Sequence, residues 1–473
     1  MASLAPSRRI AVIGGGIAGL AAAHRLLELD PLVRVTIYEA SDRLGGSLHT
    51  VSRDGFLVEQ GADSFITNVP WGVDLCRRIG LGDELIGTNP EERRAFVVRR
   101  GRLRPVPDGF VLMAPSRIWP VVTTPILSPL GKLRLAWEYF IPPRASDGDE
   151  SLASFVRRRL GREAFERLVQ PLVAGIYTAD PEKLSLAATL PRFQEMERLH
   201  GGLIRAALRG NSAPSDGPIN HAVDQEPASG ARYALFVTPR GGLSSIVSAI
   251  TARLPAGTVR LNTAVERIVR DGNRWRLSDV EFDAVIVAAP ATIASRLLAD
   301  VDGELATELS AIENAGAVVV SMAFDRQQIR HPLDGFGFVV PAIERRRILS
   351  ASFSSVKFPG RAPADKALIR TFVGGACQRE LVDLSDADLE QFVSEELGDL
   401  LGITGQPLWT MIARWSQSMP QYHLGHLDRV ARIEARARAL PGLALAGNAY
   451  RGVGIPQAIH SGEEGAARLL ARG

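Results

Sequence analysis

The first forty residues pass from a short apolar run to a helical pattern and back to a β-rich run. Residues 10–13 are apolar, residues 14–19 are rich in glycine, residues 21–29 have a helical composition, and residues 33–38 are rich in β-branched side chains. This order is typical of a βαβ unit. The sequence therefore predicts two strands joined by a tight turn and a helix at the start of the chain.

The middle of the chain divides into a helical part and a β-rich part. From about residue 75 to residue 200 the pattern is mainly helical, with interruptions by proline and glycine, which predicts a helical insertion. Further on, four β-rich runs and a helix-like segment predict a second sheet-based domain. The runs are residues 317–324, 336–340, 349–353 and 367–373, and the helix-like segment is residues 386–401.

The segment between these two parts predicts a return to the first fold. Residues 258–261 and 265–269 have the composition of strands, Asp271-Gly272 is typical of a hairpin turn, and residues 282–289 are predicted as a buried strand that ends at Pro290. We therefore expect these residues to add strands to the first domain.

Two further segments have distinct patterns. Residues 210–230 are rich in Ser, Pro, Asp, Asn and Gly, which predicts a mobile surface loop. Near the end of the chain, the pattern predicts a strand at residues 443–446, a loop over residues 447–456 and a helix to residue 470. Because 473 residues exceed what one hydrophobic core usually spans, we expect more than one lobe.

Charge excludes one class of partner. The formal net charge is only +3 and most basic residues are scattered, so nucleic acid is not expected as a partner. One local cluster could face an anionic substrate, an acidic membrane surface or solvent. Its members are Arg93, Arg94, Arg99, Arg100, Arg102 and Arg104.

Cysteine content and hydropathy predict the compartment. Cys76 and Cys377 lie far apart and lack CxxC spacing, so neither a disulfide framework nor a cysteine metal site is indicated. No apolar signal region precedes the first strand, and no run of about 18 apolar residues predicts a membrane-spanning helix. We therefore expect a cytoplasmic protein, either free or peripheral at the inner face of the membrane.

The glycine-rich turn predicts a dinucleotide site. In the run Gly14, Gly15, Gly16, Ile17, Ala18, Gly19, the three GxGxxG glycines lie directly between a strand and a helix. The first glycine permits the tight turn, the second lets a pyrophosphate approach the backbone, and the third allows the helix to pack on the strand. Glu39, at the end of the second strand, can accept hydrogen bonds from ribose hydroxyls. The alternative is a purely structural turn.

The following motifs resemble those of the glutathione-reductase-like flavoproteins, of the monoamine oxidase and porphyrinogen oxidase type. They are residues 39–46 (EASDRLGG) and residues 61–64 (GADS). Residues 447–456, just before the last helix, add small residues that suit an isoalloxazine, since a helix N-terminus can stabilise negative charge. An ordinary strand-to-helix loop is the alternative for this last segment.

Three more motifs make the resemblance closer. Residues 171–185, residues 335–341 (GFGFVVP) and residues 419–426 (MPQYHLGH) are similar to segments of the protoporphyrinogen and coproporphyrinogen oxidases, and the likeness runs from near Arg9 to near Leu469. It implies an α/β fold with a Rossmann-like FAD-binding domain, a mixed-sheet substrate domain and a helical insertion that in some members touches membranes. The FAD-binding domain is expected at residues 1–74, 231–300 and 415–473, the insertion at 75–207, the flexible loop at 208–230 and the substrate domain at 301–414.

By position in that family, the resemblance implies a set of FAD contacts. Trp415 and Val265 could equally be packing residues. The full set is Gly14, Gly15, Gly16, Ile17, Ala18, Gly19, Glu39, Ala40, Arg43, Gly61, Ala62, Asp63, Ser64, Val265, Trp415, Val453, Gly454 and Ile455.

No other catalytic chemistry is indicated. His423 and His426 have HxxH spacing, but no further ligand cluster completes a metal site, so no metal is expected. A Ser-His-Asp hydrolase is equally unsupported. In the reaction that the resemblance implies, the flavin accepts hydride and no side chain is assigned as acid or base.

The resemblance implies that a porphyrinogen and O2 are the substrates. We expect conversion of coproporphyrinogen III to coproporphyrin III in haem biosynthesis, with three H2O2 formed, since residues 421–426 and 454–456 look more like the bacterial coproporphyrinogen oxidases and Ala95 stands where protoporphyrinogen enzymes tend to have arginine. An apolar cavity with basic edges should hold the substrate. Its candidates are Arg94, Val173, Gly175, Ile176, Phe338, Tyr422 and Arg451.

Other functions stay open. A protoporphyrinogen IX oxidase would share every motif, and an FAD amine oxidase or a flavin-binding protein without catalytic role would share the FAD motifs. A peripheral membrane contact and a contact with a downstream haem-pathway enzyme are further expectations about partners.

Overall fold

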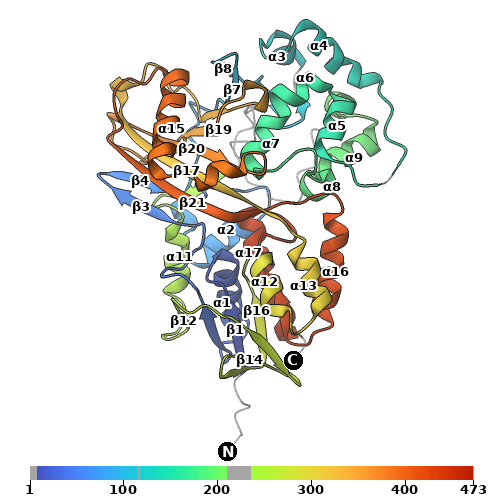
Figure 1. The fold of residues 1–473 in the computed structure, drawn as a ribbon, viewed down its shortest axis with the longest axis vertical. Helices are drawn as coiled ribbons and strands as arrows, with labels where there is room; N and C mark the ends of the chain where they lie inside the picture. The colour runs from blue at the N-terminus through green and yellow to red at the C-terminus, as the bar shows by residue number, and fades with distance from the viewer. Residues whose placement is uncertain (1–7, 116–117, 147, 210–235, 472–473) are drawn as a thin grey trace, which may run out of the picture.

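The computed structural model describes residues 8–115, 118–146, 148–209 and 236–471 (Figure 1). The loop predicted at residues 210–230 lies outside the described residues. A parallel sheet occupies the end of the molecule near the N-terminus, and a larger sheet and a group of helices lie side by side at the other end.

The parallel sheet has five strands in the order β12-β2-β1-β16-β22. Its strands come from three distant parts of the chain, and every neighbouring pair is parallel. They are β1 (Arg9–Ile13), β2 (Arg34–Tyr38), β12 (Val259–Arg260), β16 (Ala284–Val287) and β22 (Leu443–Leu445). This arrangement confirms the predicted βαβ unit and the predicted return to the first fold.

Two helices pack closely on this sheet. They are α1 (Ile17–Leu29) and the last helix, α17 (Ile455–Ala471). A side chain at Gly462 could not fit between them, because its Cβ would lie 2.1 Å from the carbonyl oxygen of Ala18. Small residues on both helices therefore fix their distance.

Two predicted strands were wrong in their bounds. The run at 282–289 is divided between β15 (Val280–Phe282) and β16, because Asp283 leaves the sheet alignment and its carboxylate accepts a 2.8 Å hydrogen bond from the amide of Arg9. The strand predicted at 265–269 begins later, as β13 (Ile268–Asp271), and pairs with β14 (Arg274–Leu277) in a separate antiparallel sheet. The composition of a segment does not show where a chain changes sheets.

The larger sheet has seven strands in the order β21-β17-β20-β19-β18-β7-β8. It is mixed, as predicted, because β18 and β7 are parallel and the other pairs are antiparallel. The strands are β21 (Trp409–Pro420), β17 (Asn314–Asp325), β20 (Lys366–Gly374), β19 (Ile348–Phe353), β18 (Gly337–Val339), β7 (Phe96–Arg99) and β8 (Arg102–Pro105). The segment predicted as a helical insertion thus also supplies two strands, and β21 crosses the boundary predicted at residue 415.

One helix covers one face of this sheet. Helix α15 (Asp386–Leu401) has the predicted bounds, because Ser385 accepts a hydrogen bond from the Asp388 amide at its start and Gly402 takes a left-handed conformation at its end. Its apolar side chains pack against β17 and the neighbouring strands. The opposite face meets the hairpin of β3 (Thr50–Arg53) and β4 (Phe56–Glu59).

The helical lobe lies beside the seven-stranded sheet and has its own core (Figure 1). Its elements are α3 (Ile118–Thr123), α4 (Pro129–Ala136), η2 (Trp137–Phe140), α5 (Leu152–Arg159), α6 (Arg162–Ala164), η3 (Phe165–Val169), α7 (Gln170–Tyr177), α8 (Leu186–Thr189), α9 (Pro191–His200) and α10 (Leu203–Leu208). In the described part of the chain, none of the helices is both long and apolar enough to cross a membrane.

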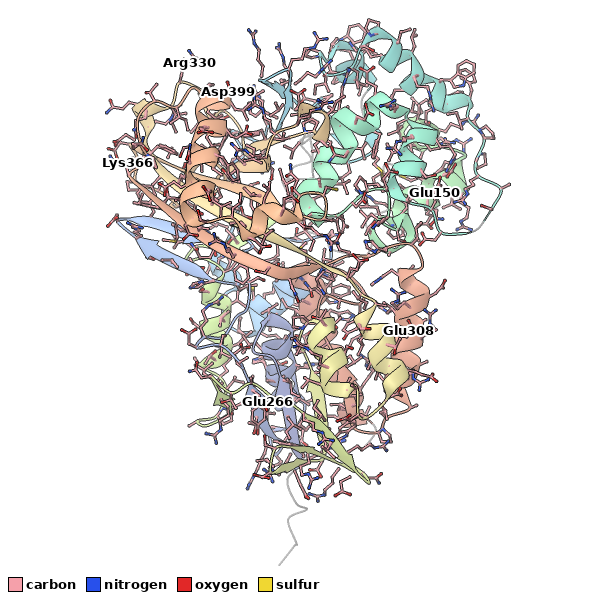
Figure 2. The ribbon with its side chains drawn as sticks, in the orientation of Figure 1. Glu150, Glu266, Glu308, Arg330, Lys366 and Asp399 are labelled. Atoms are coloured by element: carbon pink, nitrogen blue, oxygen red, sulfur yellow. The ribbon has the colours of Figure 1, made fainter. Side chains whose placement is uncertain are left out.

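Buried charges tie this lobe together. Arg159 forms an ion pair with Glu138, and both side chains are completely buried. Glu138 also accepts hydrogen bonds from the amides of Leu203 and Ile204, at 2.8 and 3.0 Å, so the pair joins η2 and α5 to the start of α10. The next residue in the chain, Arg158, donates a hydrogen bond from its guanidinium group to Glu150, which is labelled in Figure 2.

The remaining elements lie outside the two larger sheets, and among them β9 and β10 pack within the helical lobe. The helices are α2 (Trp71–Arg78), α11 (Ser244–Thr251), α12 (Ala291–Leu298), α13 (Gly303–Ser310), α14 (Ser354–Lys357) and α16 (His426–Arg438). The short strands are β5 (Phe65–Ile66), β6 (Leu85–Gly87), β9 (Phe110–Val111), β10 (Ala114–Pro115) and β11 (Phe236–Pro239). Short 3-10 turns occur at Gly82–Glu84, Arg326–Gln328, Ala342–Glu344 and Arg379–Asp383.

Candidate functional site

The turn between β1 and α1 has the geometry of a phosphate-binding loop. Gly14 has a φ of +107°, and a Cβ there would lie 2.5 Å from the carbonyl oxygen of Ala288. A Cβ at Gly19 would lie 1.9 Å from the carbonyl oxygen of Gly14, whereas one at Gly16 would meet no atom within 4 Å. Two of the glycines are therefore required by the fold, while Gly16 borders open space at the N-terminus of α1.

This open space suits a diphosphate. The first amides of a helix have no partner inside the helix and lie at its positive end, so they bind anions. Gly16 is the N-cap of α1, and no side chain caps the helix there by accepting a hydrogen bond from its first amides. The residues present therefore fit the phosphate part of a dinucleotide. Ile17 and Ala18, which open the helix, are buried against the sheet.

Glu39 lies beside this turn. One of its carboxylate oxygens accepts a 2.7 Å hydrogen bond from the amide of Gly15, and the other accepts from the amide and hydroxyl of Ser41 at 2.8 and 2.7 Å. A carboxylate oxygen can accept more than one hydrogen bond. Glu39 can thus hold the glycine turn and still accept from hydroxyl groups. Ala40 follows it at the surface, and Val265 packs at the edge of a nearby apolar cluster.

A second glycine turn meets the first. The amide of Gly45 donates a 2.8 Å hydrogen bond to the carbonyl oxygen of Gly15. The Arg43 guanidinium donates to the carbonyl oxygen of Gly46 at 2.8 Å and lies 5.9 Å from the centre of the Trp415 ring. Trp415 in turn donates a 2.8 Å hydrogen bond to the carbonyl oxygen of Gln60. Arg43 and Trp415, far apart in sequence, are therefore neighbours where the two sheets meet.

The segment Gly61, Ala62, Asp63, Ser64 carries a buried charge cluster. Lys357 donates to both carboxylate oxygens of Asp63 at 2.9 Å, and Arg370 lies 3.2 Å from the same carboxylate. Burial opposes ionisation of Asp63, but Lys357 and Arg370 outweigh it and hold the pKa of Asp63 well below its usual range. Arg370 also donates to the carbonyl oxygen of Gly61. The cluster thus keeps one carboxylate ionised between two cations.

Sequence reasoning missed Lys357 and Arg370. Arg370 is almost fully buried in the middle of β20, and Lys357 ends α14. An arginine at the centre of an otherwise apolar strand was the available signal, since buried cations require partners. Only the fold shows that the partner is Asp63.

Tyr422 holds the loop that precedes α17. Its hydroxyl donates to the carbonyl oxygen of Asn448 at 2.6 Å and accepts from the amide of Gly452 at 2.8 Å. Burial raises the pKa of Tyr422, so the phenol stays neutral. Val453, Gly454 and Ile455 follow directly and lead into the N-terminus of α17.

The two histidines of the HxxH motif have different partners. His426 stacks on Tyr422 at 3.9 Å and makes a 2.9 Å hydrogen bond with the carbonyl oxygen of Tyr450. Burial lowers the pKa of His426 to about 4, so it is neutral near pH 7. His423 lies instead 3.8 Å from Glu313. Among the described residues, no group of three or more His, Cys, Asp or Glu side chains has an arrangement that could hold a metal ion.

The family model described as flavin containing amine oxidoreductase matches residues 17–470. The chain belongs to this family. It is therefore a flavin-dependent oxidoreductase.

Relatives within this flavin amine oxidoreductase family are similar over nearly the whole chain. A coproporphyrinogen III oxidase of Propionibacterium freudenreichii is 36% identical, with 96% of this chain and 90% of the relative covered. One of Bacillus subtilis is 33% identical, with 96% of each covered. A mitochondrial protoporphyrinogen oxidase of Nicotiana tabacum is 30% identical, with 96% of this chain and 92% of the relative covered.

Solved structures share the fold. A crystal structure from Exiguobacterium sp. 255-15, assigned provisionally as a protoporphyrinogen oxidase, matches with a TM-score of 0.87 and 32% identity over 99% of both chains. A putrescine oxidase matches with a TM-score of 0.67 at 18% identity over 99% of both chains, which shows the fold alone. The α/β fold with an FAD-type domain, predicted from the sequence, is confirmed.

The predicted substrate residues lie in several places in this flavoprotein. Val173 and Tyr422 are both buried in the core of the helical lobe, and a Cβ at Gly175 would lie 3.5 Å from Val339. Phe338 faces the other side of β18 and packs 6.1 Å from Phe353, because successive side chains of a strand point to opposite faces. Val339, not Phe338, therefore faces the helices.

The other three substrate candidates are more exposed. Ile176 is 40% exposed at the end of α7. Arg94 forms a 3.0 Å ion pair with Asp334, and Arg451 forms a 2.6 Å ion pair with Glu434. Each of these arginines has a carboxylate partner of its own. Their roles toward a substrate stay predictions.

Proposed function

We propose that the chain is an FAD-dependent, oxygen-using porphyrinogen oxidase that converts coproporphyrinogen III to coproporphyrin III. The observation that carries the proposal is the likeness to coproporphyrinogen III oxidases of three bacteria, at 31–36% identity over 96–98% of this chain. The glycine turns and the Asp63 cluster supply a matching cofactor site.

FAD is the proposed cofactor because the family contains a flavin and the residues of the glycine turn fit a dinucleotide. The open side of Gly16 and the amides of α1 suit the diphosphate, and the carboxylate of Glu39 suits the ribose. Bound FAD would supply a hydride acceptor and would return electrons to O2 as peroxide. Cys76 and Cys377 lie far from the C-terminal loop in sequence, so we expect non-covalent binding.

The residues of the chain would position and shield the reaction. Tyr422 holds the loop before α17, and the N-terminus of that helix favours negative charge beside it. Lys357 and Arg370 together outweigh the single charge of Asp63, so this cluster also favours an anion. Nε2 of His426 donates to the carbonyl oxygen of Tyr450, and burial lowers the pKa of His426 to about 4, which makes it a weak base.

A second candidate is protoporphyrinogen IX oxidase. The Nicotiana tabacum relative and the Exiguobacterium structure, at 30% and 32% identity, favour it. Specificity constants for both porphyrinogens, prepared without oxygen and then exposed to O2, separate the candidates by porphyrin fluorescence and peroxide. A clear preference for protoporphyrinogen IX would overturn the first proposal. Formation of neither porphyrin would overturn both.

A test of the cofactor comes before these assays. The purified protein should be yellow, and acid or heat should release FAD from it. Flavin retained on the denatured chain, or bound NAD in its place, would contradict the proposal. Activity with simple amines would favour an amine oxidase, and slow flavin reoxidation without porphyrin formation would favour a non-catalytic flavin-binding protein.

We also propose a cytoplasmic location with a peripheral contact at the inner face of the membrane. Large apolar side chains on one side of the helical lobe support the contact. Trp119, Leu130, Leu133, Trp137 and Phe140 are each between 61% and 78% exposed. A contact with a downstream haem-pathway enzyme stays a prediction.

A further inference from the structure

The hairpin of β7 and β8 carries arginines that face one another. Arg99 lies directly opposite Arg102, and Arg104 lies opposite Val97. Opposed residues of a hairpin share one face, and like charges in this position repel. Val97 packs into the core of the helical lobe, so this face of the hairpin is the one turned toward the helices.

The turn of this hairpin is held by a carboxylate. Arg100 and Gly101 both have positive φ, and their amides donate to the two oxygens of Glu344 at 2.9 and 3.2 Å. Glu344 lies 4.0 Å from the guanidinium of Arg99. The carboxylate that lies beside Arg99 is therefore largely occupied by hydrogen bonds from backbone amides.

A cavity of about 550 Å³ lies between this hairpin and the loop that joins α3 to α4. Within the described part of the chain, the residues that line it include five arginines and no carboxylate. They are Arg99, Arg100, Arg102, Arg104 and Arg167, with Ser128 and three apolar residues of the loop. A cleft lined by one sign of charge raises the local concentration of ions of the opposite sign, so this cavity attracts anions.

The positive charge of the fifth arginine, Arg167, is only partly compensated by a carboxylate. Arg167 pairs with Glu163, but that carboxylate also accepts hydrogen bonds from the amide and hydroxyl of Ser128 at 2.5 and 2.7 Å. The Nε of Arg167 is buried and has no hydrogen-bond partner among the described residues. Burial, with repulsion from Arg167 and Arg100, lowers the pKa of Arg99. The guanidinium groups thus repel one another in the absence of a bound anion.

The surroundings of the cavity indicate which anion reaches it. The loop that lines it ends at Pro129, and the next turn of α4 exposes Leu130 and Leu133. Trp119 on α3 and Trp137 in η2 are also exposed, and these elements lie with the hairpin at the end of the molecule away from the N-terminus (Figure 1). Exposed tryptophan and leucine beside arginine are typical of surfaces that enter a lipid interface.

We infer that this arginine cavity binds the phosphate group of an anionic phospholipid while the exposed side chains of α3, α4 and η2 enter the membrane interface. The inference rests on the membrane contact proposed above and adds selectivity for acidic lipid to it. It is independent of the proposed oxidase reaction, because vesicle binding is measured without substrate.

The test is co-sedimentation of the flavin-loaded protein with vesicles of phosphatidylcholine, alone or mixed with phosphatidylglycerol. We expect at least tenfold tighter binding to the mixed vesicles. The double variant R102E/R104E should lose this preference. A matched control is R267E/R274E, which makes the same change of net charge at exposed arginines of the other lobe and should keep it.

Other outcomes overturn the inference in distinguishable ways. Equal loss of preference in both double variants would show a general charge effect and no site. Equal binding of the wild-type protein to both kinds of vesicle would contradict the headgroup site and leave the membrane contact supported. Binding to neither kind of vesicle would contradict both proposals. Phosphate binding that R102E/R104E abolishes, without vesicle binding, would assign the cavity to a soluble anion.

Two further measurements separate the apolar surface and the substrate. The variant L130S/L133S should weaken binding to both kinds of vesicle and keep the preference for phosphatidylglycerol. If it removes the preference instead, the arginines do not select the lipid. If R102E/R104E raises the KM for coproporphyrinogen III and leaves vesicle binding unchanged, the cavity serves the carboxylates of the substrate, and the lipid inference is wrong.

Discussion

The glycine turn of the parallel sheet and the arginine-rich β7–β8 hairpin of the seven-stranded sheet favour anions by different means. At the glycine turn, backbone amides at a helix N-terminus do so, and the absence of side chains makes the approach feasible. At the hairpin, five long side chains gather around a cavity. A site formed by backbone amides depends on a few glycines that cannot be replaced. A site formed by side chains depends on the total charge of those side chains.

The largest effect is expected at the third glycine of the turn. In Gly19→Val, a Cβ would lie 1.9 Å from the carbonyl oxygen of Gly14, so we expect loss of folding and of flavin binding. Circular dichroism and flavin absorbance check this. Gly16→Ala is the matched control, since it meets no atom within 4 Å; it should keep the melting temperature and weaken only flavin binding. A wild-type melting temperature in Gly19→Val would contradict the packing argument.

In the helical lobe, the largest effect should come from a buried charge. Arg159→Met leaves Glu138 buried without its ion pair, and such a loss typically costs about 3–5 kcal/mol. Urea unfolding measures the free energy. The double variant Arg159→Met with Glu138→Met should recover much of the loss, because no charge is then left unpaired. If the single variant is as stable as the wild type, the pair does not hold the lobe together.

A smaller effect, on cofactor affinity, is expected from substitution of Glu39 beside the glycine turn. Glu39→Ala should weaken FAD binding by roughly 1–3 kcal/mol, the scale of a lost hydrogen bond to a charged group. The holoprotein should then lose its colour on dilution, and fluorescence of released flavin gives the dissociation constant. Unchanged affinity would leave Glu39 with only the role of holding Gly15 and Ser41.

The smallest effect should appear as a change of pH dependence. The folded protein lowers the pKa of Asp63 below 3.8, so ionised Asp63 adds stability above pH 3.8 that is lost as the pH falls through the folded-state pKa. Asp63→Asn should therefore have a lower melting temperature than the wild type at pH 7. The difference should narrow as the pH falls below 3.8. A difference that is constant with pH would show that the ion pairs with Lys357 and Arg370 add nothing.

The same contrast explains what could be predicted from the sequence. The glycine turn, its strand and its helix follow one another in the chain, so their residues predict both the fold and the site. The bounds of α15 were also predicted, because its apolar pattern and its capping residues lie within one segment. The face of β18 on which Phe338 lies was not predicted, because a shift of one position along a strand moves a side chain to the opposite face of the sheet.

Charges that meet across the fold could not be predicted in this way. Asp63 and Lys357 are 294 residues apart, and the cavity joins residues 99–104 to residue 167 and to the α3–α4 loop. The run of arginines was visible in the sequence, but the apolar helices beside it and the hydrogen bonds that occupy Glu163 and Glu344 depend on tertiary packing. Sequence reasoning therefore found the arginines and left their surroundings open.

The order of strands in the parallel sheet has a consequence for synthesis on the ribosome. The central strand β1 can pair with β16 only after the middle of the chain has been made, and β16 can pair with β22 only near the end of synthesis. Arg8 reaches the carbonyl oxygen of Leu469, 461 residues away, so the first strand meets its last neighbours only when translation is nearly complete. Such distant pairing is slow, and the exposed strand edges attract chaperones meanwhile. The nucleotide site proposed beside β1 therefore gains its full structural support only after the last helix has been made.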